Sequence, residues 1–150
     1  MKIWEFFEKL DELVYVADIE TNELIYMNQK LRDSMGLPEP AQYVGKKCYT
    51  VLQGNTEPCK FCTNCQLKTG EFITWTHTNP VLNKRVLLKD TLVEADGRKL
   101  RLELAIDADS ESSCKSPYYY ARSETILNEC VHQIFSTASA EESIHKMLNY

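Results

Sequence analysis

The chain has 150 residues, enough for one domain with a moderate hydrophobic core and short extensions. Its 43% hydrophobic and 26% charged residues are typical of globular proteins, and its net charge of -5 argues against nucleic acid or anionic lipid as a partner. The sequence contains no apolar run long enough to span a membrane and no signal-peptide pattern, so we expect a cytoplasmic protein whose six cysteines are reduced thiols or ligands.

The first 28 residues predict a helix and a β-hairpin. Apolar residues between positions 4 and 13 recur at helical spacing, which predicts a leading amphipathic helix over residues 1–12. Val14–Ile19 and Leu24–Asn28 are β-rich runs on either side of a short polar loop. Together they predict an antiparallel pair of strands.

Short helices and an irregular segment follow this hairpin. Gln29–Met35 predicts a brief helix, with Asn28 as its N-cap and Gly36 just past its end. Prolines then interrupt the pattern, and one more helical turn is expected around Lys47–Leu52. A segment rich in cysteine comes next.

Three further strands are predicted over Glu71–Asn79, Arg85–Glu94 and Lys99–Asp107. Asp96 and Gly97 form a turn between the last two, which makes them an antiparallel hairpin. In the last strand, apolar and mostly polar positions alternate: Leu100, Leu102, Leu104 and Ile106 with Arg101, Glu103, Ala105 and Asp107. This alternation predicts one buried face and one face exposed to solvent.

The composition changes again near the C-terminus. Residues 110–122 are small and polar, which indicates a linker. Residues 123–150 predict outgoing helices at the start of a following domain, with an apolar stripe from Ile126 to Phe135. A helix this short is marginally stable alone in water, so we expect the stripe to contact a second copy of the chain, in a homodimer, or the next domain.

The cysteine-rich segment is the strongest candidate for chemistry. Four thiols fall close together, at Cys48, Cys59, Cys62 and Cys65. They could simply pack in the core or form an adventitious disulfide, because free cysteines behave as small hydrophobes. They could also bind zinc or an iron–sulfur cluster, or the Cys59-x-x-Cys62 pair could act as a redox switch. All three interpretations stay open.

Six side chains are candidates for a ligand pocket: Tyr15, Tyr26, Met27, Tyr49, Trp75 and His77. Aromatic and methionine side chains near strands usually belong to the core, which is the alternative for the first four. Trp75 and His77 share one face of a predicted strand, so Trp75 would line a pocket and His77 could contact a ligand if that face points inward. More often such a histidine is a surface or edge residue, and no catalytic partner accompanies it.

The order and spacing of these elements resemble the PAS-domain family over residues 4–109. The resemblance is carried by Tyr15–Asp18 with Ile25–Asn28, by the Gly45-Lys46-Lys47-Cys48-Tyr49-x-x-Leu52 segment, and by the three closing strands. The Cys48-Tyr49…Pro58-Cys59-x-x-Cys62 pattern is similar to a subset of bacterial PAS domains in signalling proteins. Domains of that subset often precede GGDEF-type diguanylate cyclase or histidine-kinase output domains.

The resemblance implies an α+β fold over residues 13–109: a five-stranded antiparallel sheet with short helices over one face, flanked by N- and C-terminal helices. It also implies a sensory and dimerisation module that binds a small molecule, or responds to redox or metal, and relays to an output domain outside this chain. We expect no catalysis here; the alternative is a thiol-based redox enzyme or a zinc or iron–sulfur protein. Haem and flavin are not expected, because a histidine on a central helix and the flavin-type cysteine motif are both missing.

Overall fold

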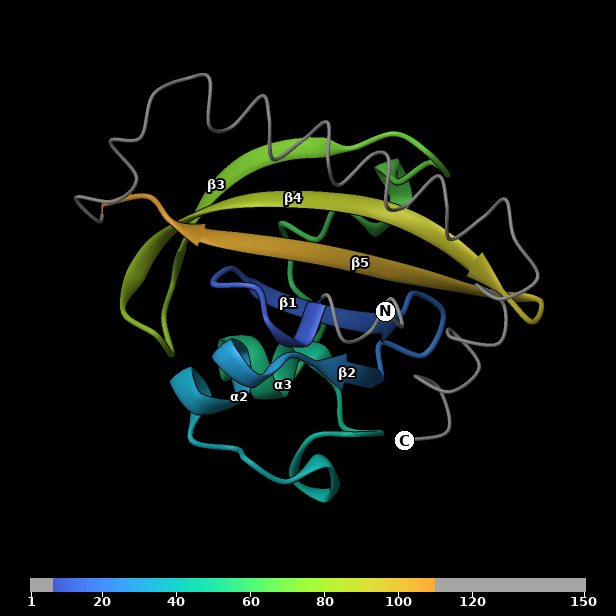
Figure 1. The fold of residues 1–150 in the computed structure, drawn as a ribbon. Coiled ribbons are helices and arrows are strands. Elements are labelled where there is room, and N and C mark those ends of the chain that lie inside the picture. The colour runs from blue at the N-terminus through green and yellow to red at the C-terminus, as the bar shows by residue number, and fades with distance from the viewer. Residues whose placement is uncertain (1–6, 110–150) are drawn as a thin grey trace.

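The computed structural model describes residues 7–109, which form one curved sheet with short helices on one of its faces (Figure 1). The five strands lie in the order β2-β1-β5-β4-β3, and each neighbouring pair is antiparallel. Their bounds are β1 Leu13–Asp18, β2 Leu24–Met27, β3 Ile73–Asn79, β4 Lys84–Ala95 and β5 Arg98–Asp107. The expected α+β architecture with a five-stranded antiparallel sheet is confirmed.

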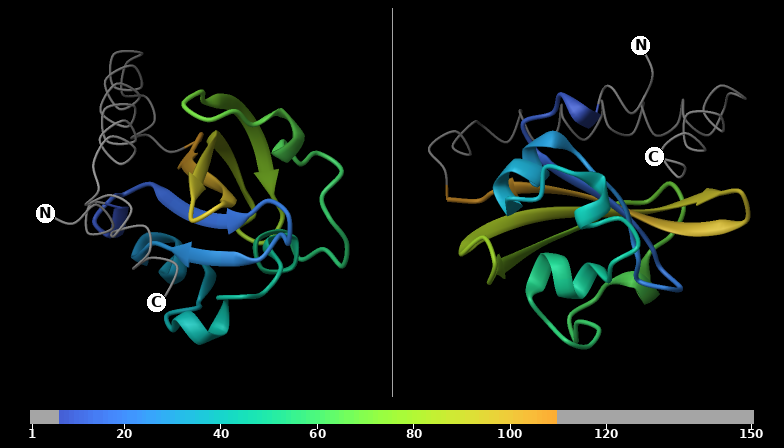
Figure 2. Two further views of the ribbon diagram at one scale, coloured as in Figure 1. Left: turned by 90° about the vertical axis from the view of Figure 1, so that its right-hand side faces the viewer. Right: turned by 90° about the horizontal axis from the view of Figure 1, so that it is seen from below.

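Two short α-helices, α2 (Gln29–Met35) and α3 (Cys48–Gln53), lie on the same face of the sheet (Figures 1 and 2). Two single 3-10 turns, η1 (Pro40–Gln42) and η2 (Asn64–Gln66), belong to the loops after them. Among the described residues, no helix is both long enough and apolar enough to cross a membrane.

Asn28 determines where β2 ends and α2 begins. Its Oδ1 accepts hydrogen bonds from the backbone N–H groups of Leu31 (3.1 Å) and Val14 (3.0 Å). Its Nδ2 donates to the backbone carbonyls of Phe7 (3.0 Å) and Glu12 (2.9 Å). This fully buried side chain therefore caps the helix, as predicted, and also fastens β1 and the N-terminal turn to it.

The turn between β4 and β5 is the predicted one. Asp96 and Gly97 both have left-handed backbone conformations, with φ of 51° and 72°, and they lie between the paired residues Ala95 and Arg98. A two-residue turn with positive φ at both positions matches the twist of the flanking strands. It also sets the register of the whole β4–β5 ladder.

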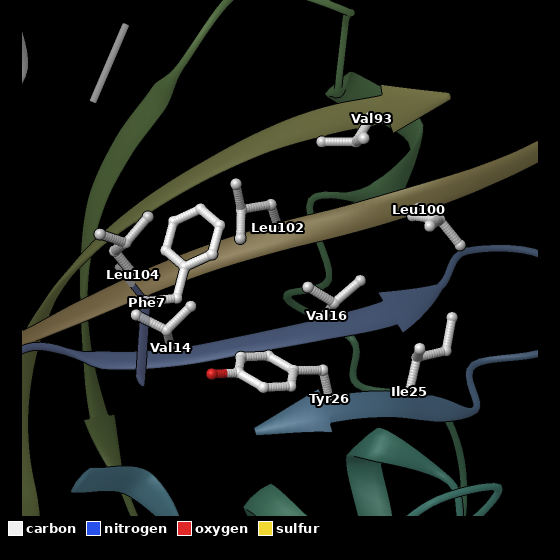
Figure 3. Packing of buried hydrophobic residues seen from close by; sticks show 9 residues of the cluster. All are labelled: Phe7, Val14, Val16, Ile25, Tyr26, Val93, Leu100, Leu102 and Leu104. Atoms are coloured by element: carbon white, nitrogen blue, oxygen red, sulfur yellow. The ribbon is translucent and has the colours of Figure 1, made fainter. Parts of the chain in front are cut away.

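The main hydrophobic cluster lies on the face of the sheet opposite α2 and α3 (Figure 3). Its members come from the N-terminal turn and from four strands: Phe7, Val14, Val16, Ile25, Tyr26, Val93, Leu100, Leu102 and Leu104. A second cluster fills the space between the sheet and the helices, around Met27, Leu31 and Tyr43. Buried apolar side chains therefore lie on both faces of the sheet.

The structure corrects one expectation about β5. Its polar positions were expected to face solvent, but Arg101 and Glu103 are only 5% and 8% exposed. β5 is the central strand, and the loop after α3 covers its second face. The alternation distinguished the two faces of β5 correctly, but it does not show whether a polar face is covered.

Two other expectations involve the ends of the chain. Of the leading helix expected over residues 1–12, residues 1–6 lie outside the described residues; among the rest only Phe7 and Glu8 are helical, and residues 9–12 form a turn and bends before β1. The linker at 110–122, the outgoing helices at 123–150 and their apolar stripe also lie outside them. They remain predictions.

Candidate ligand-binding site

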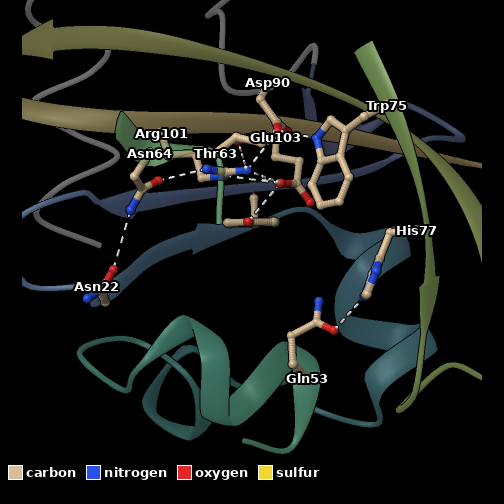
Figure 4. Close-up of polar contacts among 10 residues, drawn as sticks. Asn22, Gln53, Thr63, Asn64, Trp75, His77, Asp90, Arg101 and Glu103 are labelled. Carbon is tan, nitrogen blue, oxygen red and sulfur yellow. Dashed lines mark hydrogen bonds and ion pairs between the residues drawn. The ribbon is translucent and has the colours of Figure 1, made fainter. Parts of the chain in front are cut away.

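A network of charged and polar side chains is buried on the helix-covered face of the sheet (Figure 4). Asp90 on β4 lies directly opposite Glu103 on β5, and Arg101 lies two residues from Glu103 on the same face. Thr63 reaches the network from the loop between α3 and β3, and Trp75 reaches it from β3. We call Thr63, Trp75, Asp90, Arg101 and Glu103 the Arg101 cluster.

The guanidinium of Arg101 is the centre of this cluster. Its Nη2 lies 2.7 Å from Asp90 Oδ2 and donates to Thr63 Oγ1 at 2.7 Å. Its Nε donates to Glu103 Oε2 at 3.1 Å, and its Nη1 donates to Asn64 Oδ1 at 2.7 Å. All three nitrogens therefore have protein acceptors, which is what a cation needs in order to be buried.

Asp90 Oδ2 receives two further donors. The indole N–H of Trp75 donates to it at 2.5 Å and the hydroxyl of Thr63 at 2.9 Å. Its other oxygen, Oδ1, is buried and has no donor among the described residues. Asp90 is completely inaccessible, so this oxygen marks a place where the cluster lacks a proton or a positive charge.

The raised pKa of Glu103 favours a proton on this carboxyl group, directly opposite Asp90. Burial raises the pKa of Glu103 to about 8, helped by the adjacent Asp90 carboxylate, against the opposing effect of Arg101. One arginine cannot compensate two buried carboxylates, so Glu103 is mostly protonated at neutral pH and can donate a hydrogen bond to Asp90. The hydroxyl of Tyr15 donates to Glu103 Oε2 at 2.9 Å, and burial raises the pKa of Tyr15 well above its usual value.

A cavity of about 40 Å³ opens beside the Arg101 cluster, between the sheet, α3 and the loop after α3. This is enough room for a few water molecules. Four aromatic rings line it, together with the charged pair Arg101 and Glu103, three thiols and several amides. The aromatic residues are Tyr15, Tyr49, Phe61 and Trp75.

The loop over residues 55–68, here called the cysteine loop, forms the outer wall of the cavity. Thr63 fastens it to the Arg101 cluster, and Asn64 also contacts Asn22 in the β1–β2 turn at 3.4 Å. The ring of Phe61 stacks against those of His77 and Trp75, with centroids 4.3 and 5.9 Å away. The loop thus packs against Trp75, which lines this cavity, and against His77, which lines the cavity next to it.

The four clustered cysteines are not all brought together. Cys48, Cys59 and Cys62 line the cavity, but Cys65 is exposed and does not. Within residues 7–109, no three cysteine, histidine or acidic side chains converge as ligands for a metal ion. Burial raises the pKa of Cys48 to about 11 and also raises that of Cys59, so both thiols are protonated at neutral pH.

The six candidates for a ligand pocket lie in three places. Tyr15, Tyr49 and Trp75 line the cavity. His77 lines a smaller cavity of about 30 Å³ next to it, where its Nε2 lies 2.9 Å from Gln53 Oε1 and burial lowers its pKa. The inward orientation of Trp75 and His77 follows from the alternation of β3, whose threonines face solvent.

Tyr26 and Met27 line neither of these two cavities. Tyr26 belongs to the cluster on the opposite face of the sheet, where its hydroxyl donates to Glu8 at 2.6 Å. Met27 points to the helix-covered face but is packed under α2 against Leu31. β2 is an edge strand beneath α2, so its inward side chains meet the helix before they can reach the cavity.

The sequence interpretation missed the Arg101 cluster itself. Arg101 and Glu103 were assigned to a solvent-exposed face, and Asp90 was passed over inside the Arg85–Glu94 strand candidate. The sequence did carry one signal: a carboxylate in the middle of a long strand candidate is rarely buried without a cationic partner. The directly opposite Glu103 could be found only once the register was known.

Comparison with known proteins identifies the fold. No protein-family model matches the sequence, and no curated protein matches it significantly. Among solved structures, the Rhodobacter sphaeroides LOV protein is similar over 99% of this chain and 89% of its own, with 17% identity and a TM-score of 0.61. A variant of it, RsLOV d2, gives 16% identity and a TM-score of 0.64 over the same shares.

A PAS domain of an HTR-like protein from Haloarcula marismortui is also similar, with 13% identity and a TM-score of 0.52, over 68% of this chain and 85% of its own. At sequence identities of 13% to 17%, the structural similarity establishes the fold alone. The chain has the PAS fold shared by PAS and LOV domains, and the resemblance noted in the sequence is confirmed at that level.

Proposed function

We propose that this chain is the sensory module of a signalling protein, with the cavity beside the Arg101 cluster as its ligand site. The observation that carries the proposal is the wall of the cavity, which contains a buried arginine and a carboxylate of strongly raised pKa. Buried charges are costly to fold around, and perturbed carboxylates beside a cavity are typical of functional sites.

The proposed relay is a shift between two packings of the cysteine loop. Thr63 and Asn64 reach Arg101 from that loop, so a ligand that contacts Arg101 or Glu103 changes the partners available to the loop. A ligand that favours one packing over the other shifts their populations. In line with the sequence resemblance, the flanking helices would pass this change to a diguanylate cyclase or histidine-kinase domain, in a homodimer.

A thermal-shift screen of small polar compounds tests the ligand site. We expect one or more compounds to raise the melting temperature of the wild-type chain, and Glu103→Gln to alter that response. Glu94→Gln, an exposed glutamate on β4, serves as the matched control and should respond like wild type. If a diverse library produces no shift, and native mass spectrometry of the chain purified from cells shows no bound molecule, the ligand-sensor proposal fails.

A redox response is the second candidate, because Cys48, Cys59 and Cys62 line the same cavity. The backbone N–H of Cys62 donates to the carbonyl of Cys59 at 3.2 Å, which folds their segment into a tight turn. Hydrogen peroxide would oxidise the two thiols to a disulfide and be reduced to two waters. The raised pKa values of Cys48 and Cys59 favour a slow switch over a thiol enzyme, which needs a thiolate.

Peptide mapping after peroxide treatment tests the redox candidate. We expect a Cys59–Cys62 disulfide in wild type and in Cys65→Ser, whose exposed thiol lies away from the cavity. Recovery of both cysteines as free thiols, under conditions that oxidise Cys65, would rule the switch out.

A further inference from the structure

The charges around the cavity do not balance. Arg101 and Glu103 line the cavity, with Asp90 behind them, so two carboxylates face one guanidinium. Asp18 also lines the cavity, but its carboxylate pairs with Arg98 at 3.0 Å. The cluster is therefore neutral only while one carboxylate carries a proton, and a cationic ligand could replace that proton.

The aromatic rings provide the other half of a cation site. Tyr15, Tyr49, Phe61 and Trp75 all line the cavity. The hydrogen bond from the Trp75 indole to Asp90 fixes one of these rings beside the carboxylates. Rings grouped around a carboxylate attract ammonium groups, because the ring faces carry negative partial charge.

An anion fits the cavity less well, although Arg101 is present. Each nitrogen of its guanidinium already donates to a protein acceptor: Asp90, Glu103, Thr63 or Asn64. Only the second N–H of Nη1 has no acceptor among these four residues, so an anion would gain at most one guanidinium hydrogen bond without displacing them, and it would bring a third negative charge to the cluster. A cation can bind without breaking any of these hydrogen bonds.

We propose that the cavity binds a small organic ammonium ion, with Glu103 as the counter-charge and the four aromatic rings around its alkyl groups. This inference rests on the proposed ligand-sensing function and names the chemical class of the ligand. Binding would favour the ionised form of Glu103, so one proton would leave the protein for each cation that enters.

The proton release gives binding a defined pH dependence. With a Glu103 pKa of about 8, the apparent affinity should rise about tenfold from pH 6 to pH 7 and level off above pH 8. The groups that act directly on Glu103 are Asp90 on β4, Arg101 on β5 and Tyr15 on β1. Asp18, Cys48, Cys59 and Cys62 line the same cavity, and His77, whose pKa is lowered by burial, lines the smaller cavity together with Glu103. The tyrosine and arginine pKa values are raised, so neither group titrates in this window.

The test uses tetramethylammonium chloride as the probe and tert-butanol as its neutral analogue of similar size. The full chain is titrated with each compound at constant ionic strength, and the indole N–H resonance of Trp75 is followed by NMR. We expect tetramethylammonium to bind with a dissociation constant in the millimolar range, and tert-butanol to bind at least about tenfold more weakly.

The variants separate charge from shape. Glu103→Gln should weaken tetramethylammonium binding about tenfold at pH 8 and abolish its pH dependence, whereas the control Glu94→Gln should change neither. Phe61→Leu keeps the half-exposed loop position apolar but removes one ring, and should weaken binding about two- to fivefold. This second variant carries the test if Glu103→Gln does not fold.

Equal binding of tert-butanol and tetramethylammonium would overturn the proposal, as would wild-type affinity in Glu103→Gln or in Phe61→Leu. If the compound screen yields ligands but tetramethylammonium does not bind, the cation proposal fails and the ligand-sensing function stands. If neither the screen nor tetramethylammonium gives binding, both fail.

Discussion

At the residue scale, two buried polar side chains each connect several elements of the fold through hydrogen bonds. Asn28 joins β1, the N-terminal turn and α2 through four hydrogen bonds, and Arg101 joins two strands and a loop. Each is nearly inaccessible to solvent. Replacing either one leaves buried partners without hydrogen bonds, which costs more than the bonds themselves contribute.

Asn28→Ala should be strongly destabilising for this reason. We expect a loss of about 3 kcal/mol in the free energy of unfolding, from the missing helix cap and the unpaired groups of β1 and the N-terminal turn. Urea denaturation followed by circular dichroism measures it. Ser34→Ala, which removes an exposed side-chain hydrogen bond on α2, is the control and should change stability by less than about 0.5 kcal/mol.

Glu103 should make the protein less stable as the pH rises. Its pKa is about 8 in the folded chain and near the ordinary 4.5 when unfolded, so the folded state holds a proton that the unfolded state has lost. Stability should therefore fall between about pH 4.5 and pH 8, by up to about 5 kcal/mol, and then level off. Urea midpoints measured across this range should show the slope in wild type and in Glu94→Gln.

The same series in Glu103→Gln separates this group from all others. Glutamine does not ionise, so the fall in stability between pH 5 and pH 8 should become much smaller. An unchanged slope in this variant would assign the pH dependence to another group and remove the basis for a protonated Glu103.

At the element scale, the cysteine loop is held to the sheet by the polar contacts of Thr63 and Asn64 and by the ring of Phe61. Thr63 is its most buried polar anchor, at 6% exposure, and contacts both Arg101 and Asp90. A loop fastened mainly through one polar cluster can detach without unfolding the sheet. This is the property that the proposed relay requires.

Thr63→Val keeps the shape of that anchor but removes its hydroxyl. We expect faster backbone hydrogen exchange over residues 55–68 and a loss of stability of about 1–3 kcal/mol, with exchange in β4 and β5 less affected. Thr78→Val on the exposed face of β3 is the matched control. Equal exchange in both variants would mean that the loop does not depend on the Arg101 cluster.

At the scale of the whole molecule, the first and last described strands meet in the middle of the sheet. β5 pairs with β1 on one side and with β4 on the other, although β1 and β5 are far apart in the sequence. β5 is therefore needed to join the β2–β1 and β4–β3 halves. Removing it should leave two hairpins, which are not stable by themselves.

A chain that ends at residue 97 should accordingly remain unfolded. Far-UV circular dichroism and urea titration should show a cooperative transition for a chain that ends at residue 109 and none for the shorter one. A cooperative transition in the shorter chain would show that β5 does not hold the two halves together.

The sequence predicted local features well and the burial of polar groups poorly. The caps at Asn28 and Gly36 and the turn at Asp96-Gly97 depend on neighbours in the chain, and all three were found in advance. The Arg101 cluster depends on the register between β4 and β5 and on a loop nearly forty residues away, which no local pattern encodes. The places of Tyr26 and Met27 outside the two cavities have the same origin, because α2 decides what β2 can reach.

The central position of β5 also has a mechanical consequence. A pull applied at Asp109 along β5 acts parallel to the strand and perpendicular to its inter-strand hydrogen bonds on both sides, so these bonds resist sliding together instead of opening one by one. The strand that bears this load also carries Arg101 and Glu103. Tension at that end of the domain would therefore be transmitted through a stiff, doubly clamped strand to the wall of the cavity.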